Sequence, residues 1–175
     1  FIAGNLSVLV PDPRDIDELI ALLRKFRFTS MSSVNTLLQG LMMHPDFDKI
    51  DFSRVKAIIA GGTALVKEIA DQWRERTGSE IYEGYGLSET AAVLTCNNPQ
   101  SSRLGTVGVG MVAQEIKLID AAGVTVDHDE RGEICVRGAQ VMQGYWQRPE
   151  ATAEAIDAEG WFRTGDVGVM GADGF

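Results

Sequence analysis

The sequence has no long hydrophobic run, only two cysteines and two histidines, and fewer basic than acidic residues. No stretch approaches the roughly 18 consecutive apolar residues of a membrane-spanning helix, so we expect no transmembrane segment. The 16 basic and 25 acidic residues give a net charge of −9. This balance argues against nucleic acid as a partner, because a nucleic-acid surface needs a basic patch.

The scarcity of cysteine and histidine also excludes a clustered metal site. Cys96 and Cys135 lie far apart, and no Cys/His group has metal-ligand spacing. Two reduced thiols are typical of a cytosolic protein. His44 and His128 lie in expected loops, and neither is a candidate general base. Phe1 shows neither a basic start nor a cleavage pattern, and without an initiator Met we expect an excerpt of a longer chain.

The first part of the chain alternates between expected strands and helices. Strands are expected at 28–32, 55–60 and 79–83, with helices before and between them. Expected N-caps are Asp12, Ser32 or Ser33, and Thr63, while Gly78 ends the third helix. The order strand–helix–strand over about 30 residues is a βαβ unit, which predicts a parallel α/β sheet.

The later part of the chain has a different pattern. Gln114–Ile119 and Gly132–Arg137 alternate with a period of two and are separated by turn residues. This pattern predicts an antiparallel hairpin. We therefore expect an α/β subdomain over residues 1–103, followed by a β-rich, distorted barrel-like subdomain over residues 104–175.

Gly61-Gly62-Thr63 follows an expected parallel strand. Ligands of open α/β sheets bind beyond the carboxyl ends of the strands, and glycines allow a close backbone approach. On this segment alone we favour a tight turn with a capping threonine, because such strand-Gly-Gly turns are common.

Tyr82–Thr90 (YEGYGLSET) also follows an expected strand and is more specific. Glycines on both sides of Tyr85 would let the chain double back and present the ring to a purine. Ser88 offers a hydroxyl to a phosphate oxygen, and Glu89 offers a hard carboxylate to Mg²⁺. The two turns follow neighbouring expected strands and should meet at one sheet edge. In the alternative interpretation Tyr85 fills the core and Ser88 merely starts a helix.

Five ordered motifs carry a resemblance that covers the chain from Phe28 onward. From there the sequence resembles the adenylate-forming superfamily of acyl-CoA synthetases, luciferases and peptide-synthetase adenylation domains. Ser33–Leu37 and Gln140–Pro149 are similar in particular to bacterial long-chain fatty acid–CoA ligases. The five motifs are GGT at 61–63, YGLSET at 85–90, GEICVRG at 132–138, GYW at 144–146 and WFRTGD at 161–166.

The resemblance implies a ligase that joins a carboxylate to ATP and passes the acyl group to coenzyme A. Tyr85 would stack on adenine, Asp166 would bind both ribose hydroxyls, and Glu89 would hold Mg²⁺. Ser88 would contact phosphate, so Ser88 and Glu89 are the implied catalytic residues. The implied nucleotide-binding residues are Gly61, Gly62, Thr63, Glu83, Gly84, Tyr85, Gly86, Leu87, Ser88 and Asp166.

The acyl group has its own implied residues, Asn35, Ala92 and Val93. Expected partners are a fatty acid or another carboxylic acid, ATP or AMP, Mg²⁺ and coenzyme A. An aryl- or short-chain acyl-CoA ligase, a ligase that serves a carrier protein, and a non-catalytic nucleotide-binding remnant are the alternatives. The family's phosphate loop and C-terminal lysine domain are expected outside this chain, so the fragment alone is expected to be inactive. The parent is expected in the cytoplasm, with peripheral contact with the inner membrane face left open.

Overall fold

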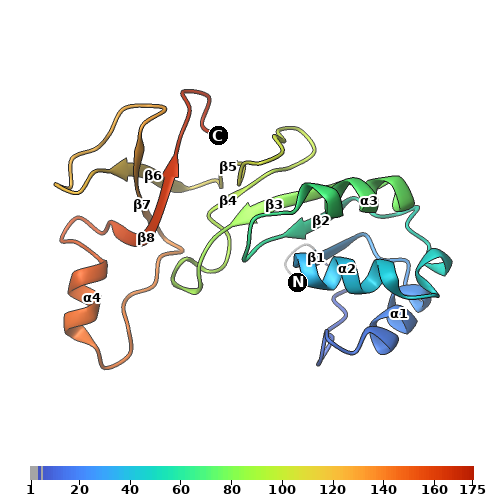
Figure 1. Ribbon diagram of the computed structural model, residues 1–175. Coiled ribbons are helices and arrows are strands. Elements are labelled where there is room, and N and C mark those ends of the chain that lie inside the picture. The colour runs from blue at the N-terminus through green and yellow to red at the C-terminus, as the bar shows by residue number, and fades with distance from the viewer. Residues whose placement is uncertain (1–3, 5) are drawn as a thin grey trace. The chain divides into compact units, whose positions relative to one another are not determined.

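The structure is a computed structural model that describes residue 4 and residues 6–175. Its contacts divide the chain into two compact units, unit 1 ending at Ile81 and unit 2 running from Tyr82 to Phe175 (Figure 1). The predicted subdomain boundary near residue 103 stays a prediction. None of the helices in the described part of the chain has the length and hydrophobicity of a membrane span.

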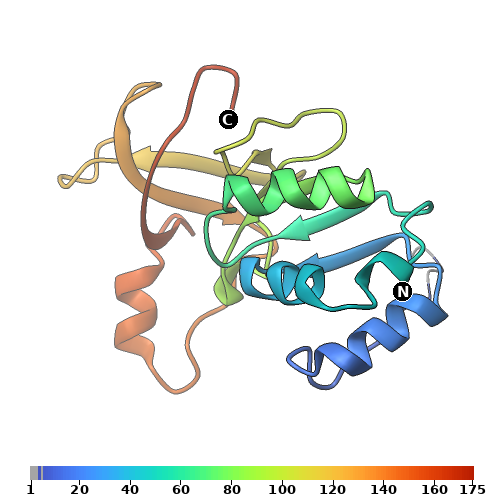
Figure 2. The ribbon, with the colours of Figure 1, turned by 45° about the vertical axis from the view of Figure 1, so that its right-hand side comes forward.

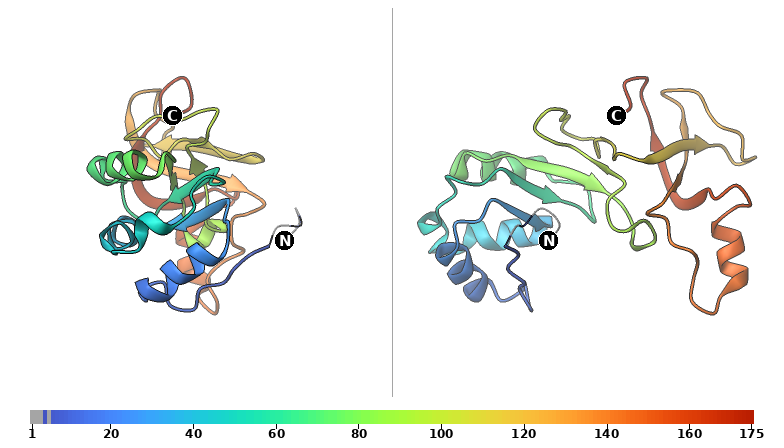
Figure 3. Two further views of the ribbon diagram at one scale, coloured as in Figure 1. Left: turned by 90° about the vertical axis from the view of Figure 1, so that its right-hand side faces the viewer. Right: turned by 180° about the vertical axis from the view of Figure 1, so that it is seen from behind.

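Unit 1 is a parallel α/β unit. The strands β1 and β2 pair in parallel, with Ser30 opposite Ala57 and Ser33 opposite Ala60. The helices α2 and α3 lie side by side on one face of this pair (Figures 1 and 3). This arrangement confirms the predicted α/β class. The elements are α1 (Ile16–Lys25), β1 (Ser30–Ser33), α2 (Asn35–Met43), the 3₁₀ turn η1 (Phe47–Lys49), β2 (Ala57–Ala60) and α3 (Lys67–Thr77).

An apolar core holds these elements together. Leu38, Phe47, Ile58 and Trp73 are fully buried. The Phe47 and Trp73 rings meet edge to face at 5.5 Å, a preferred aromatic geometry. The indole N–H of Trp73 donates to Ser79 Oγ at 3.0 Å, so its burial leaves no unpaired donor.

The helix starts differ from the predicted caps. Asp15, not Asp12, caps α1, and its side chain accepts from the Glu18 N–H at 2.9 Å. Asp12 instead accepts from the backbone and side chain of Arg14 within the preceding turn. Gly78 ends α3 in the left-handed conformation, as predicted.

The other two predicted caps are also wrong. Ser32 and Ser33 both belong to β1, and α2 starts after Val34 without a side-chain cap. Thr63 lies upstream of α3, which starts after Val66, again without a side-chain cap. Before α3, the side chain of Asn35 instead bonds to the loop at Thr63, Ala64 and Val66.

Unit 2 is almost entirely antiparallel. One set of paired strands is β3–β4–β5, and a separate three-stranded sheet has the order β6–β7–β8 (Figure 2). The described strands do not close into a barrel, so the barrel-like description is corrected to an open sheet. The elements are β3 (Ile81–Tyr85), the 3₁₀ turn η2 (Ser88–Thr90), β4 (Thr95–Cys96), β5 (Val109–Gly110), β6 (Gln114–Ile119), β7 (Arg131–Gly138), α4 (Pro149–Ala155) and β8 (Phe162–Val169).

The predicted hairpin is β6 and β7, which pair from Gln114–Gly138 to Ile119–Glu133. Leu94 forms a buried cluster with Val136 of β7 and Phe162 of β8, and Tyr85 packs against this cluster. The sequence analysis did not predict α4, although Pro149 at its first turn is a recognised start signal.

Candidate nucleotide site

The tyrosine turn, residues 85–90, is fixed by its own hydrogen bonds. Thr90 is fully buried, and its Oγ1 accepts from the Leu87 N–H at 3.1 Å and donates to the Leu87 carbonyl at 3.0 Å. Ser88–Thr90 forms one 3₁₀ turn that ends at Ala91 in the left-handed conformation. The short helical start foreseen at Ser88 is thus a single turn held by Thr90.

Gly86 allows the chain to double back. A Cβ at Gly86 would lie 1.8 Å from the Ala92 carbonyl oxygen, a distance no side chain could occupy. The returning strand is close enough for the Leu94 N–H to donate to the Tyr85 carbonyl at 2.7 Å. Ala92 itself has a φ of 82°, which fixes the return at some cost in backbone strain.

Tyr85 connects the core of unit 2 to an exposed carboxylate. Its ring is half-buried against the cluster of Leu94, Val136 and Phe162. Its hydroxyl donates to Asp166 Oδ2 at 2.6 Å. Burial, and then the bond to Asp166, raise the pKa of Tyr85, so the phenol stays protonated as a donor. Tyr85 therefore packs on the core and also reaches the second predicted site residue.

Asp166 lies on β8 and is exposed. The preceding Gly165 has a φ of 76°, and its N–H donates to Glu133 Oε1 at 3.1 Å. Glu133 also accepts from Arg163 Nε at 3.0 Å, and this partner holds the pKa of Glu133 below its usual value. Arg163 is thus an exposed, paired side chain, and Glu133 anchors the turn that presents Asp166.

Ser88 and Glu89 lie on the 3₁₀ turn after Tyr85. Ser88 is exposed, whereas Glu89 is half-buried and accepts from the Tyr145 hydroxyl at Oε1, at 3.0 Å. That bond to Glu89 is the main reason why the pKa of Tyr145 is raised. The second carboxylate oxygen of Glu89 has no hydrogen-bond partner among the described residues.

The oxygen atoms of Ser88 and Glu89 suit Mg²⁺ only when a nucleotide supplies further ligands. In the described part of the chain, no group of three or more His, Cys, Asp or Glu side chains could hold a metal. Mg²⁺ is commonly bound by one or two carboxylates together with substrate phosphates and water. Glu89, with one free oxygen and the exposed Ser88 beside it, fits that mode of binding.

Asn35 holds the loop of unit 1 that contains Gly61, Gly62 and Thr63. Its Nδ2 donates to Thr63 Oγ1 at 3.1 Å and to the Ala64 carbonyl at 2.8 Å, and its Oδ1 accepts from the Val66 N–H at 3.0 Å. The oxygen and the nitrogen of the Asn35 amide therefore both have hydrogen-bond partners. Gly62 turns the loop with a φ of 84°. A predicted acyl-binding residue thus holds a predicted nucleotide-binding loop, while its contact with an acyl group stays a prediction.

The remaining predicted residues lie on and after β3. Glu83 is buried, and its carbonyl accepts from the Asn97 N–H at 2.8 Å. Gly84 pairs with Cys96, while Ala92 and Val93 are exposed. Gly61–Thr63 belongs to unit 1 and the tyrosine turn to unit 2, so their meeting at one sheet edge stays a prediction.

Tyr145 is the site neighbour that sequence reasoning missed. It stands in the Gly144-Tyr145-Trp146 motif that supported the resemblance, which assigned it no role. No signal in the sequence indicated this contact, because Tyr145 is exposed and water can satisfy an exposed hydroxyl.

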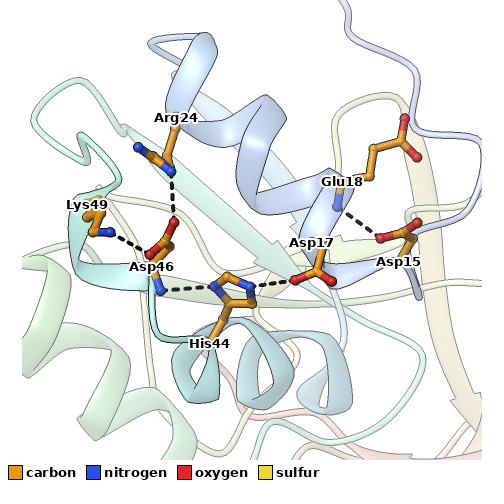
Figure 4. Close-up of polar contacts among 7 residues, drawn as sticks. All are labelled: Asp15, Asp17, Glu18, Arg24, His44, Asp46 and Lys49. Carbon is orange, nitrogen blue, oxygen red and sulfur yellow. Dashed lines mark hydrogen bonds and ion pairs between the residues drawn. The ribbon is translucent and has the colours of Figure 1, made fainter.

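His44 has a structural role in unit 1. Its Nδ1 accepts from the Asp46 N–H at 3.0 Å, so the proton of the neutral ring is on Nε2, 2.8 Å from Asp17 Oδ1 (Figure 4). Asp46 also accepts from Arg24 at 2.9 Å and from Lys49 at 2.7 Å. These contacts connect α1 to the end of α2 and leave no free imidazole nitrogen.

Comparison with known proteins shows the family of this chain. The sequence profile of the AMP-binding enzyme family matches residues 1–146. The chain belongs to this family. It is 41% identical over 173 residues to the long-chain fatty acid–CoA ligase of Salmonella typhimurium, an alignment that covers 98% of this chain and 31% of that protein.

Two further comparisons involve aromatic acids. This AMP-binding family member is 33% identical to 4-coumarate–CoA ligase 1 of Glycine max, over 97% of this chain and 60% of that protein. Its structure also resembles that of an anthranilate CoA ligase in complex with anthranoyl-AMP, with a TM-score of 0.88 and 28% identity. That match covers 98% of this chain and 33% of the ligase. The chain thus spans about a third of the long-chain ligase relative.

Proposed function

We propose that this chain provides the adenosine-binding part of an ATP-dependent acid–thiol ligase that acts on a long-chain fatty acid. The carboxylate of the acid would attack the α-phosphate of ATP, releasing pyrophosphate and giving an acyl-adenylate. The thiol of coenzyme A would then displace AMP and form the thioester. The long-chain ligase relative and the anthranoyl-AMP complex support this reaction class.

The hydrogen bond between Tyr85 and Asp166 carries the proposal. It joins the hydroxyl of Tyr85 to the carboxylate of Asp166, so a ring suited to a purine and a group suited to a ribose diol are neighbours. A carboxylate can accept from both ribose hydroxyls, and charged acceptors form the stronger hydrogen bonds. Since one oxygen of Asp166 already holds Tyr85, the carboxylate is oriented before a nucleotide arrives.

The other residues of the tyrosine turn divide the nucleotide between them. Glu83 and Gly84 would lie near the amino edge of adenine, with Gly86 and Leu87 shaping the turn. Ser88 would contact phosphate, and Glu89 would hold the Mg²⁺ that travels with ATP. That ion would offset negative charge on the phosphates as pyrophosphate leaves.

Gly61, Gly62 and Thr63 would lie along the adenine and the carboxylate end of the acyl group. Asn35, Ala92 and Val93 would border the acyl group. A cytoplasmic location is part of the proposal, supported by the two free thiols among the described residues, Cys96 and the buried Cys135.

Titration calorimetry with AMP tests the adenosine site. We expect Tyr85→Ala and Asp166→Asn each to weaken AMP binding by about tenfold, because a stacking ring or a charge-assisted hydrogen bond contributes about 1–3 kcal/mol. Trp146→Ala is the control, since Trp146 is 86% exposed and lies outside the turn. Equal AMP affinity in Tyr85→Ala and the wild type would refute the stacking role.

An aromatic acid is the second candidate substrate. The coumarate and anthranilate ligases among the similar proteins favour it. ATP–pyrophosphate exchange by the whole protein distinguishes the two. Exchange supported by palmitate and not by coumarate or benzoate is expected, and the reverse pattern would assign the aryl acid.

A further inference from the structure

Glu89 is attached to one distant segment at two points. The Tyr145 hydroxyl donates to its Oε1 at 3.0 Å, across 56 positions of sequence. The Met142 N–H donates to its backbone carbonyl at 2.8 Å. The segment that carries Met142 and Tyr145 therefore fixes both the backbone and the side chain of Glu89.

The backbone of Tyr145 is in turn held by a side chain of α4. Its backbone N–H donates to Thr152 Oγ1 at 2.9 Å, and the same hydroxyl donates to the Arg148 carbonyl at 2.9 Å. The preceding Gly144 has a φ of 149°, and a Cβ there would lie 2.7 Å from Thr152 Cγ2. Glycine is therefore required for Thr152 to reach the backbone of Tyr145.

The two oxygens of the Glu89 carboxylate therefore have different surroundings. One oxygen of Glu89 receives a neutral hydrogen bond, which orients the group without cancelling its charge. The other oxygen has no hydrogen-bond partner within the described residues. Groups that hydrogen-bond to a metal-binding carboxylate fix its orientation and raise its affinity for the metal.

We propose that Tyr145, positioned by Thr152, is a positioning residue that aims the free oxygen of Glu89 at nucleotide-bound Mg²⁺. The inference rests on the proposed role of Glu89 in holding that ion. It adds a function for the Gly144-Tyr145 segment and for the first turns of α4. Tyr145 acts through Glu89 and touches neither nucleotide nor metal.

The test compares ATP binding with and without Mg²⁺, measured by titration calorimetry on the whole 175-residue chain. The ratio of the affinity with saturating Mg²⁺ to the affinity in EDTA is the magnesium gain. We expect Tyr145→Phe to reduce this gain by about tenfold, the usual effect of removing a group behind a metal ligand. Metal-free ATP affinity and AMP affinity should stay at the wild-type values.

Three further variants complete the experiment. Glu89→Gln should remove most of the magnesium gain, and Thr152→Val should reduce it while keeping the tyrosine ring. Thr152→Val also keeps the proposal testable if Tyr145→Phe folds poorly, which a thermal melt would reveal. Trp146→Phe is the matched control and should behave as the wild type, because Trp146 follows Tyr145 in the chain and its ring is 86% exposed.

The outcomes separate the two proposals. The positioning role alone would be overturned if Glu89→Gln loses the magnesium gain while a folded Tyr145→Phe keeps it in full. If Tyr145→Phe does not fold, a full gain in Thr152→Val has the same meaning. A full gain in Glu89→Gln, or no gain in the wild type, would overturn the metal role of Glu89 and the positioning role with it. Loss of AMP affinity in Tyr145→Phe would show a general structural role and would also contradict the proposal.

Discussion

Glu133 shows how one ionised side chain connects two strands next to the candidate site. It joins β7 to β8 through Arg163 and through the Gly165 N–H, one residue before Asp166. Its side chain is 20% exposed, and that of Arg163 is 48% exposed. Because solvent screens such a pair, we expect its contribution to the free energy of unfolding to be modest.

We expect Glu133→Gln to lower the free energy of unfolding at pH 7 by at most about 1 kcal/mol. The pKa of Glu133 is lowered in the folded state, chiefly by Arg163. The stabilisation is therefore fully present above the unfolded pKa, about 4.3, and is lost as the pH falls through the lower folded value. Urea unfolding at pH 7 and at pH 3 should show the variant and the wild type converging in acid.

The matched control is Glu115→Gln. Glu115 pairs with Arg137 at 2.9 and 2.8 Å, but its side chain is 60% exposed and, among the described residues, receives no backbone N–H. At pH 7, Glu115→Gln should lower the free energy of unfolding by less than Glu133→Gln does. An equal or larger effect of Glu115→Gln would contradict the importance given to the Gly165 contact.

Element starts were harder to predict than element types. The alternating pattern of β6 and β7 gave the right strands and pairing, because a two-residue period is a property of the strand itself. The caps of α1, α2 and α3 were placed wrongly. Two or more Asp, Ser or Thr residues precede α1 and α2, and Thr63 precedes α3. Only the tertiary path decides whether one of these side chains reaches a free N–H.

The start of α1 provides a direct test of this point. Asp15→Ala should lower the free energy of unfolding by about 1 kcal/mol, the usual cost of removing an N-cap. The lost bond is the one from the Glu18 N–H to Asp15 Oδ1 at 2.9 Å. Urea unfolding of both single variants is the measurement, with Asp12→Ala as the control that breaks only an exposed turn contact. A larger effect of Asp12→Ala would restore the predicted cap and refute the observed one.

At the scale of the whole molecule, the class and family were readable from the sequence, and the contacts within the site were not. The motifs at 61–63, 85–90 and 161–166 were readable because each is a continuous string. The bonds from Tyr85 to Asp166 and from Tyr145 to Glu89 join residues 81 and 56 positions apart. Such pairs depend on the return of β7, β8 and the segment before α4, which no local pattern specifies.

Net charge provides a further prediction at this scale. The chain carries −9, and metal-free ATP is a polyanion, so long-range repulsion should slow their encounter. Raising NaCl from about 10 to about 100 mM shortens the screening length from about 30 to about 10 Å. We therefore expect the association rate constant of metal-free ATP to rise at least about twofold with salt, the reverse of steered binding.

Stopped-flow fluorescence with a labelled ATP in EDTA measures this rate, and labelled adenosine is the uncharged control. Adenosine should associate at the same rate at both salt concentrations, because it carries no charge to be screened. Adding Mg²⁺ should reduce the salt effect on ATP, since the ion cancels part of the phosphate charge before the encounter. A rate for metal-free ATP that falls with salt would show that a local basic surface outweighs the net charge of −9.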